Sequence, residues 1–146
     1  MSWKSMLMAM AIASNEDEVS LPAYTEITDA DAEAIRVLIN KQLTAFREGD
    51  AQGAYEISST AIQQTFSSPS KLMQIIRAHY PSLADPRRAW FGDYTMTPDG
   101  IGQLVRVADA SGAHTHLVYL VVKEADGSWR INGCVALREE SAAMAA

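Results

Sequence analysis

Two histidines are the first pattern in this sequence that could carry chemistry. His114 and His116 stand in the stretch AHTHLVYLVVKE, and residues two apart on a strand point to the same face. Two imidazoles on one face could bind a metal ion, but a zinc site needs at least three protein ligands. The same face continues through three aliphatic residues and offers no carboxylate before Glu124. The spacing favours solvated hairpin residues, and we expect no metal site.

Cys134, the only cysteine, is the second candidate. It could be a nucleophile, a metal ligand or a packing residue, and a reactive thiolate needs a nearby cation or a helix N-terminus. The turn signal at Asp126-Gly127 places Cys134 in the middle of a strand, where neither is supplied, and free cysteine is often buried. A regular strand would put Cys134 on the face of Asn132, and a bulge at Gly133 would shift that register. We expect a buried thiol that reacts slowly.

The elements that position these residues begin with helices. Thr28 is a good N-cap, acidic residues follow it, and Gly49 supplies a C-cap. Apolar residues recur at helical spacing between these signals, which predicts an amphipathic helix from Asp29 to Glu48. Further signals predict shorter helices: a cap at Asp50, a helical piece over 60–66, a start at Ser68-Pro69 and a stop at Pro81.

From Arg88 onward the hydrophobic period changes to two, which is typical of strands. Glycine-containing turn signals divide this region into β-rich runs joined by consecutive hairpins. The runs cover 88–97, 101–109, 113–124 and 128–139. Helices first and an antiparallel meander after is the α+β layout, so the sequence predicts helices packed on an antiparallel sheet.

One predicted strand is more apolar than a sheet with one wet face requires. Leu117–Val122 is apolar at odd and even positions, whereas a strand in such a sheet should alternate. The helices can cover one face, and a second copy of the chain is the simplest cover for the other. We therefore expect a homodimer formed through the sheet.

Composition places the chain among ordinary globular domains. Its 146 residues are 48% hydrophobic and 21% charged, which fits one domain with its own core. The net charge is −6 and no basic run exceeds Arg87-Arg88, so we expect no nucleic-acid interface. No apolar run approaches the roughly 18 residues of a membrane span. Phosphate-binding glycine loops and nucleophile elbows are missing, and we expect no cofactor.

The N-terminal segment 1–27 has two interpretations. Lys4, an apolar run and Ala11-Ile12-Ala13 follow one another in the order of a secretory signal, which would direct the protein to the periplasm or outside the cell. The alternative is a Met/Ala-rich or disordered tail on a cytoplasmic protein. The acidic stretch after it lacks periodicity and is interpreted as a linker. A single domain then covers 28–140, and 141–146 is a frayed tail.

Several stretches together resemble a known family. LINKQLTAFREGDAQGAYEISS resembles the opening helix pair of the NTF2-like (SnoaL-like) superfamily, and EADGSWRINGCVAL resembles its closing hairpin. With SSPSKLMQIIRAHYPSL between them, the chain looks most like the bacterial DUF4864 family, whose function is unknown. The resemblance implies a cone in which about three helices pack on a curved antiparallel sheet around a pocket. It also implies frequent dimers, and it favours export because family members often look exported.

The resemblance also directs attention to an acid–base pair. Isomerases of the superfamily use a carboxylate base on the sheet with a tyrosine donor in an apolar pocket. Asp93 with Tyr119 or Tyr55 could imitate that pair. Asp93 could instead be an edge-strand charge that protects against aggregation.

Aromatic residues of the sheet half could line a ligand pocket or fill the core. The pocket candidates are Tyr55, Tyr80, Trp90, Asp93, Tyr119, Asn132 and Cys134. No catalytic residue is assigned, because the fold hosts enzymes and non-enzymatic modules alike. We expect a non-enzymatic dimeric module that binds a small apolar molecule or a partner in the cone. The alternatives are an isomerase or dehydratase and an interaction protein with a filled cone.

Overall fold

The computed structural model describes residues 27–98 and 100–137, and the signal-like segment and frayed tail lie outside them. The first described helix, α2 (Asp29–Glu48), has the predicted bounds. The side-chain oxygen of Thr28 accepts a hydrogen bond from the backbone N–H of Asp31 at 3.0 Å. Gly49 ends the helix with a φ of 72°, a left-handed conformation that glycine adopts without a Cβ penalty. Local capping therefore fixes both ends of α2.

Shorter helices follow, and most begin at the predicted signals. Side chains of Asp50, Ser59 and Ser68 cap the next three helices. Pro81 lies beyond the end of α5 as expected, but it also opens a short helix that was not predicted, because proline fits the first helical turn. The bounds are α3 (Ala51–Glu56), α4 (Thr60–Phe66), α5 (Pro69–His79) and α6 (Pro81–Ala84).

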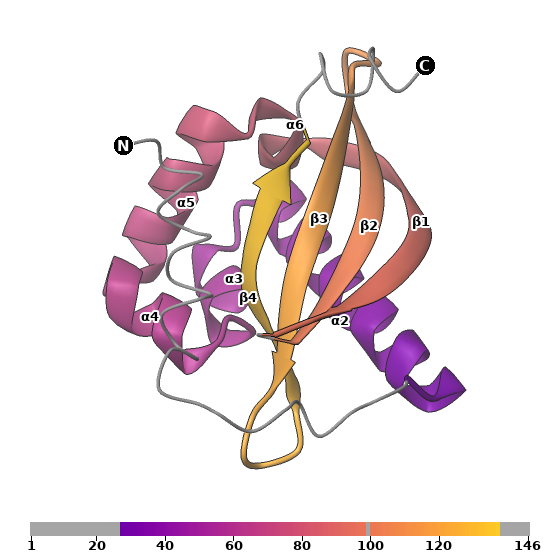
Figure 1. Ribbon diagram of the computed structural model, residues 1–146. Coiled ribbons are helices and arrows are strands. Elements are labelled where there is room, and N and C mark those ends of the chain that lie inside the picture. Colours follow the sequence, from indigo (N-terminus) through magenta and orange to yellow (C-terminus); the bar gives the residue numbers. More distant parts are fainter. Residues whose placement is uncertain (1–26, 99, 138–146) are drawn as a thin grey trace.

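The strands form one antiparallel sheet in the order β1-β2-β3-β4, so consecutive strands are hairpin neighbours as predicted. Their bounds are β1 (Pro86–Thr97), β2 (Gly100–Asp109), β3 (His114–Lys123) and β4 (Trp129–Ala136). Figure 1 shows a curved sheet with the described helices on one side, α4 and α5 beside β4 and α2 behind the strands. The predicted α+β fold is confirmed.

The inner face of the sheet, which meets the helices, carries the core. Ile101, Val105, Leu117 and Val121 are all 0% exposed and pack with helical residues such as Ile39. Fully burying one such side chain contributes about 1.5–3 kcal/mol. The alternation along each strand therefore sets which side chains can reach the interior.

The opposite, outer face carries a second group of apolar side chains. The register aligns Leu104 with Val118 and Val118 with Val135, and Leu120 and Val122 share their face of β3. We call these residues the outer apolar block: Leu104, Val118, Leu120, Val122 and Val135. Four of the five are half-buried and Leu120 is buried. The Leu117–Val122 segment thus presents apolar side chains on both faces of the sheet.

A bulge near the end of the chain decides where Cys134 points. The register between β3 and β4 shifts at Leu120/Val121, and Gly133 has a φ of 145°. Cys134 therefore pairs with Tyr119, and Ile131 pairs with Val121. The bulge foreseen at Gly133 moves Cys134 onto the inner face with Ile131.

No helix among the described residues has the length and apolar character needed to cross a bilayer.

Candidate functional site

A small cavity lies where α4, α5 and β4 meet. Its volume is about 30 Å³, which is room for about two water molecules. Ligand pockets usually measure about 300–1,000 Å³. Gln42, Ser58 and Cys134 supply the polar and sulfur atoms of its lining, and the rest is apolar. This cavity is therefore about ten times smaller than the lower end of that range.

Sequence reasoning missed two polar residues of this lining. Gln42 is 5% exposed and Ser58 is 2% exposed. Gln42 lies between Ile39 and Phe46 on the apolar stripe of α2, and a polar residue on such a stripe is the signal that could have identified it. Ser58 donates its hydroxyl to the carbonyl of Ala54 at 3.0 Å and carries no comparable sequence signal.

Tyr80 joins the end of α5 to the edge strand β4. The residue is 2% exposed, and its hydroxyl donates a hydrogen bond to the carbonyl oxygen of Cys134 at 2.8 Å. β4 is the edge of the sheet, and beyond it the backbone N–H and C=O of Ile131 bond to Ile57 and Ser59. Tyr80 thus helps to cover polar backbone groups along the edge that faces away from β3. Burial raises the pKa of its phenol far above the ordinary value.

Tyr119 lies on the inner face of β3 and is fully buried. It is 0% exposed, and its hydroxyl has no hydrogen-bond partner within the described part of the chain. Burial raises the pKa of this phenol well above its ordinary value. Both Tyr80 and Tyr119 therefore stay protonated near neutral pH, and neither is a general base there.

Cys134 occupies the wall of the cavity beside Tyr119. The residue is 5% exposed, and burial raises the pKa of its thiol to about 12, while a separate interaction of the thiol with the Tyr80 side chain lowers it in part. A thiol with this pKa holds almost no thiolate at neutral pH. The structure therefore gives Cys134 the environment of a packing residue.

Asn132 lies in the bulge and is tied to the start of α4. Its side-chain oxygen accepts a hydrogen bond from the Ser59 hydroxyl at 2.6 Å, and the same Ser59 oxygen accepts from the backbone N–H of Ile62 at 3.2 Å. Asn132 is 2% exposed, and its side-chain nitrogen has no partner among the residues that the structure describes. This contact joins α4 to β4 across 73 positions of sequence.

Tyr55 links two short helices and is absent from the cavity lining. Its hydroxyl donates to the carbonyl of Gln63 at 2.8 Å. The Gln63 side-chain amide donates back to the carbonyl of Tyr55 at 2.8 Å. This reciprocal pair holds α3 against α4.

Asp93 lies in a bulge of β1 that falls between Phe91 and Tyr94. Its side chain is exposed, and its carboxylate makes no hydrogen bond or ion pair to any other described residue. Tyr119 is fully buried. The structure therefore does not join Asp93 to either tyrosine, and the outcome matches the edge-charge interpretation.

Trp90 points away from the core. Its strand neighbours Ala89 and Phe91 pack against the core cluster, and alternation sends Trp90 to the outer face. There it pairs in register with Arg106. The structure thus separates Trp90 from the other pocket candidates.

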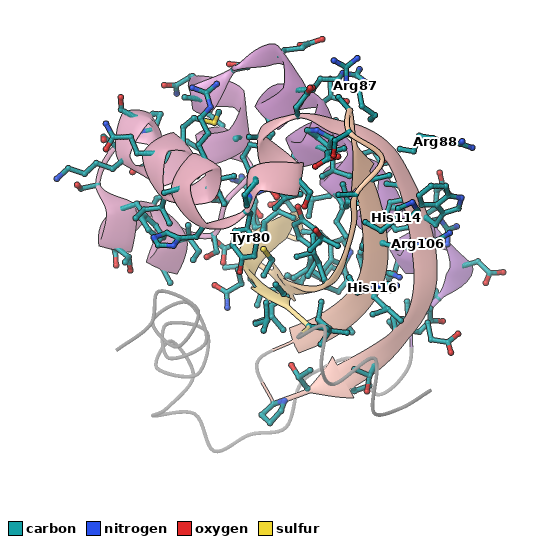
Figure 2. All side chains as sticks on the ribbon, turned by 90° about the horizontal axis from the view of Figure 1, so that it is seen from above. Tyr80, Arg87, Arg88, Arg106, His114 and His116 are labelled. Carbon is teal, nitrogen blue, oxygen red and sulfur yellow. The ribbon has the colours of Figure 1, made fainter. Side chains whose placement is uncertain are left out.

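The surroundings of Trp90 are cationic. The Arg106 guanidinium carbon lies 4.1 Å from the Trp90 ring centroid, and that of Arg88 lies 5.1 Å away. The His114 ring stacks on Trp90 with centroids 5.5 Å apart and an angle of 13°. His116 pairs in register with Arg106. Figure 2 shows Arg88, Arg106, His114 and His116 gathered on the β1–β3 side and Tyr80 apart from them.

The two histidines share a face, as their spacing indicates, but their neighbours do not suit a metal cation. Arg106 lies opposite His116, and like charge repels a metal cation. No group of three or more His, Cys, Asp or Glu side chains placed for a metal occurs among the described residues.

Comparisons with known proteins agree with this architecture. A family model described as "Domain of unknown function (DUF4864)" matches residues 28–144. No curated protein matches the chain. Aln2 from a Streptomyces species has a TM-score of 0.50 at 16% identity, with 87% of this chain and 100% of Aln2 covered.

Two further solved structures are similar. A protein of unknown function with a cystatin-like fold from Nostoc punctiforme has a TM-score of 0.52 at 12% identity, covering 77% of this chain and 93% of that protein. A protein from Catenulispora acidiphila has a TM-score of 0.51 at 12% identity, covering 79% of this chain and 96% of that protein. At these identities the likeness shows the fold alone.

Proposed function

The chain belongs to the DUF4864 family of domains of unknown function, and we propose that this member is a non-enzymatic binding module that works as a homodimer. The outer apolar block carries the proposal. Leu104, Val118 and Val135 form a row across three strands, and all three are half-buried in the single chain. An apolar patch on an otherwise polar surface typically marks an interaction site.

A second copy of the chain is the occupant that this face fits best. Sheet faces pack well on each other at a spacing of about 10 Å, and a two-fold axis brings the same patch of each chain together. The block would then sit at the centre of an isologous interface.

The chemistry of the interior supports a binding role over catalysis. Acid–base catalysis is most effective when the catalytic pKa lies near the working pH. The buried ionisable groups among the described residues, Tyr80, Tyr119 and Cys134, have pKa values raised by burial. The isomerase or dehydratase alternative would need a titratable group beside the cavity, and the exposed position of Asp93 does not favour it.

The cavity beside Cys134 is the second element of the proposal. Its apolar lining from α4, α5 and β4 suits a small apolar group of a ligand or partner. At about 30 Å³ it admits only a group of side-chain size unless α4 and α5 move outward. Tyr80, Tyr119 and Asn132 would pack against the residues that line this cavity and hold them in place.

Sedimentation velocity at about 10 μM tests the dimer. We expect twice the chain mass of 15.9 kDa. Val118→Arg should dissociate the dimer, because burying an unpaired charge costs at least about 3 kcal/mol, which is about a 100-fold rise in dissociation constant. Val37→Arg is the matched control, since Val37 is an exposed aliphatic residue on α2.

A monomeric wild type, or equal behaviour of both variants, would contradict the dimer. Native mass spectrometry of the protein from its own cells tests the cavity in the same sample. A bound small molecule that persists in Val118→Arg would support the cavity as a site separate from the interface.

A further inference from the structure

Two arginine and two histidine side chains occupy one end of the outer face, beyond the outer apolar block. The register places Arg88, Ala108 and His114 in one row across β1–β3, and Trp90, Arg106 and His116 in the next row. Directly opposite residues lie about 4.5–5.5 Å apart. We call Arg88, Trp90, Arg106, His114 and His116 the cationic cluster.

No described residue accepts a hydrogen bond from the two guanidiniums of this cluster. Each guanidinium carries five N–H donors, and neither Arg88 nor Arg106 makes a hydrogen bond or ion pair to a described residue. The neighbouring Arg87 differs, because its guanidinium pairs with Asp85 at 3.1 Å. Like charges brought this close repel one another, so an anion bound between them would relieve the repulsion.

Trp90 gives the cluster a fixed shape. The Arg106 guanidinium stands 4.1 Å from the Trp90 ring centroid, and the His114 ring stacks on it at 5.5 Å. Stacking uses the flat face of a guanidinium and leaves its in-plane N–H groups available. Ala108, between Arg88 and His114 in register, is small enough to let these side chains approach over it. Trp90 therefore restricts the rotamers of its cationic neighbours before any ligand binds, which lowers the entropy cost of binding.

A hollow adjoins the cluster on the side of α2. A cleft of about 90 Å³ lies between α2 and the start of β1, and Arg47, Arg87 and Arg88 are among its lining residues. Asn40 and Thr44 add polar side chains there. Arg88 is common to the cleft lining and the cluster, and β1 is an edge strand of the sheet, so the two features lie on the two sides of this edge.

We propose that the cationic cluster is a binding site for the phosphate group of a small molecule, such as a phosphate monoester or a diphosphate. Phosphate carries about −1.5 to −2 charges at neutral pH and accepts hydrogen bonds in three directions, which matches two guanidiniums and two imidazoles better than a planar, singly charged carboxylate does. A long polyanion is disfavoured, because the net charge of −6 repels it beyond the cluster.

Isothermal titration calorimetry with sodium pyrophosphate at pH 7 and 150 mM NaCl tests the site. We expect saturable binding with one site per chain, and Arg106→Gln and Arg88→Gln should each weaken it at least tenfold. Arg36→Gln is the matched control, since Arg36 lies on α2 and its guanidinium pairs with Glu33. Imidazole NMR signals of His114 and His116 should shift in the wild type.

Inorganic phosphate and succinate distinguish the ligand chemistry in the same assay. Inorganic phosphate should bind more weakly than pyrophosphate and shift the same imidazole signals, whereas succinate should not compete. The proposal is overturned if Arg36→Gln loses as much affinity as Arg106→Gln, if binding vanishes at 150 mM NaCl, or if succinate binds as well as pyrophosphate. Arg88→Gln keeps the test valid if Arg106→Gln alters the fold, because Arg88 is exposed.

Discussion

The two buried tyrosines allow one substitution to be tested in two opposite environments. Tyr80 and Tyr119 are 2% and 0% exposed, so Tyr→Phe removes a single buried oxygen at either site. The Tyr80 hydroxyl donates to the Cys134 carbonyl at 2.8 Å. The Tyr119 hydroxyl has no partner in the described part of the chain. The two variants should therefore change the free energy of unfolding in different directions.

The hydrogen bonds of the two hydroxyls set the expected change in the free energy of unfolding for each variant. Tyr80→Phe leaves a buried carbonyl of β4 without its donor, which costs about 1–3 kcal/mol. Tyr119→Phe removes a hydroxyl whose unpaired burial costs about 1–3 kcal/mol, so stability should stay equal or rise. A difference of about 2 kcal/mol between the variants corresponds to about 8 °C in Tm for a domain of this size.

Urea unfolding followed by circular dichroism at one fixed protein concentration measures both variants. The concentration is held constant because a dimer's apparent stability depends on it. Equal m values would show that the midpoints report stability. If Tyr119→Phe destabilised the protein as much as Tyr80→Phe, the Tyr119 hydroxyl would have a hydrogen-bonding partner such as a buried water, and the reasoning would fail.

Three further predictions concern the same part of the fold. The pKa of the Cys134 thiol rises from 9.0 to about 12 on burial, so the unfolded state releases its proton first and stability falls as the pH rises from about 9 towards 12. Cys134→Ala should flatten the start of this fall near pH 9 in urea titrations, where tyrosines with an ordinary pKa of about 10 are still mostly protonated. A thiol reagent should label Cys134 at the rate of local opening, and a rate equal to that of free cysteine would contradict its burial. Ser59→Ala removes the cap of α4 and the donor to Asn132, which should cost about 1–3 kcal/mol, whereas Ser70→Ala, at an exposed serine of α5, should change the melting temperature little.

The sequence determined the elements and their order, because local interactions decide them. Thr28 and Gly49 cap α2, each through hydrogen bonds to residues three or four positions away. The turns between the strands likewise depend on neighbouring residues, so the order of the hairpins was predictable. The absence of apolar/polar alternation in Leu117–Val122 also identified a strand with apolar side chains on both faces.

The tertiary structure alone decided which side chains meet. Gly133 illustrates the reason, since one inserted residue reverses the face of every residue after it, and Cys134 reaches the inner face only through this bulge. The burial of Tyr80 against β4 depends on how closely α5 approaches that strand, which no local pattern specifies.

The cationic cluster on the outer face of the sheet could not be predicted from the sequence either. The sequence contains no basic run longer than Arg87-Arg88, and charge counting along the chain therefore missed it. Arg88, Arg106 and His116 come from three different strands, and the register of two hairpins brings them to adjacent rows. Sequence periodicity gives each side chain its face, but only strand pairing determines its neighbours across the sheet.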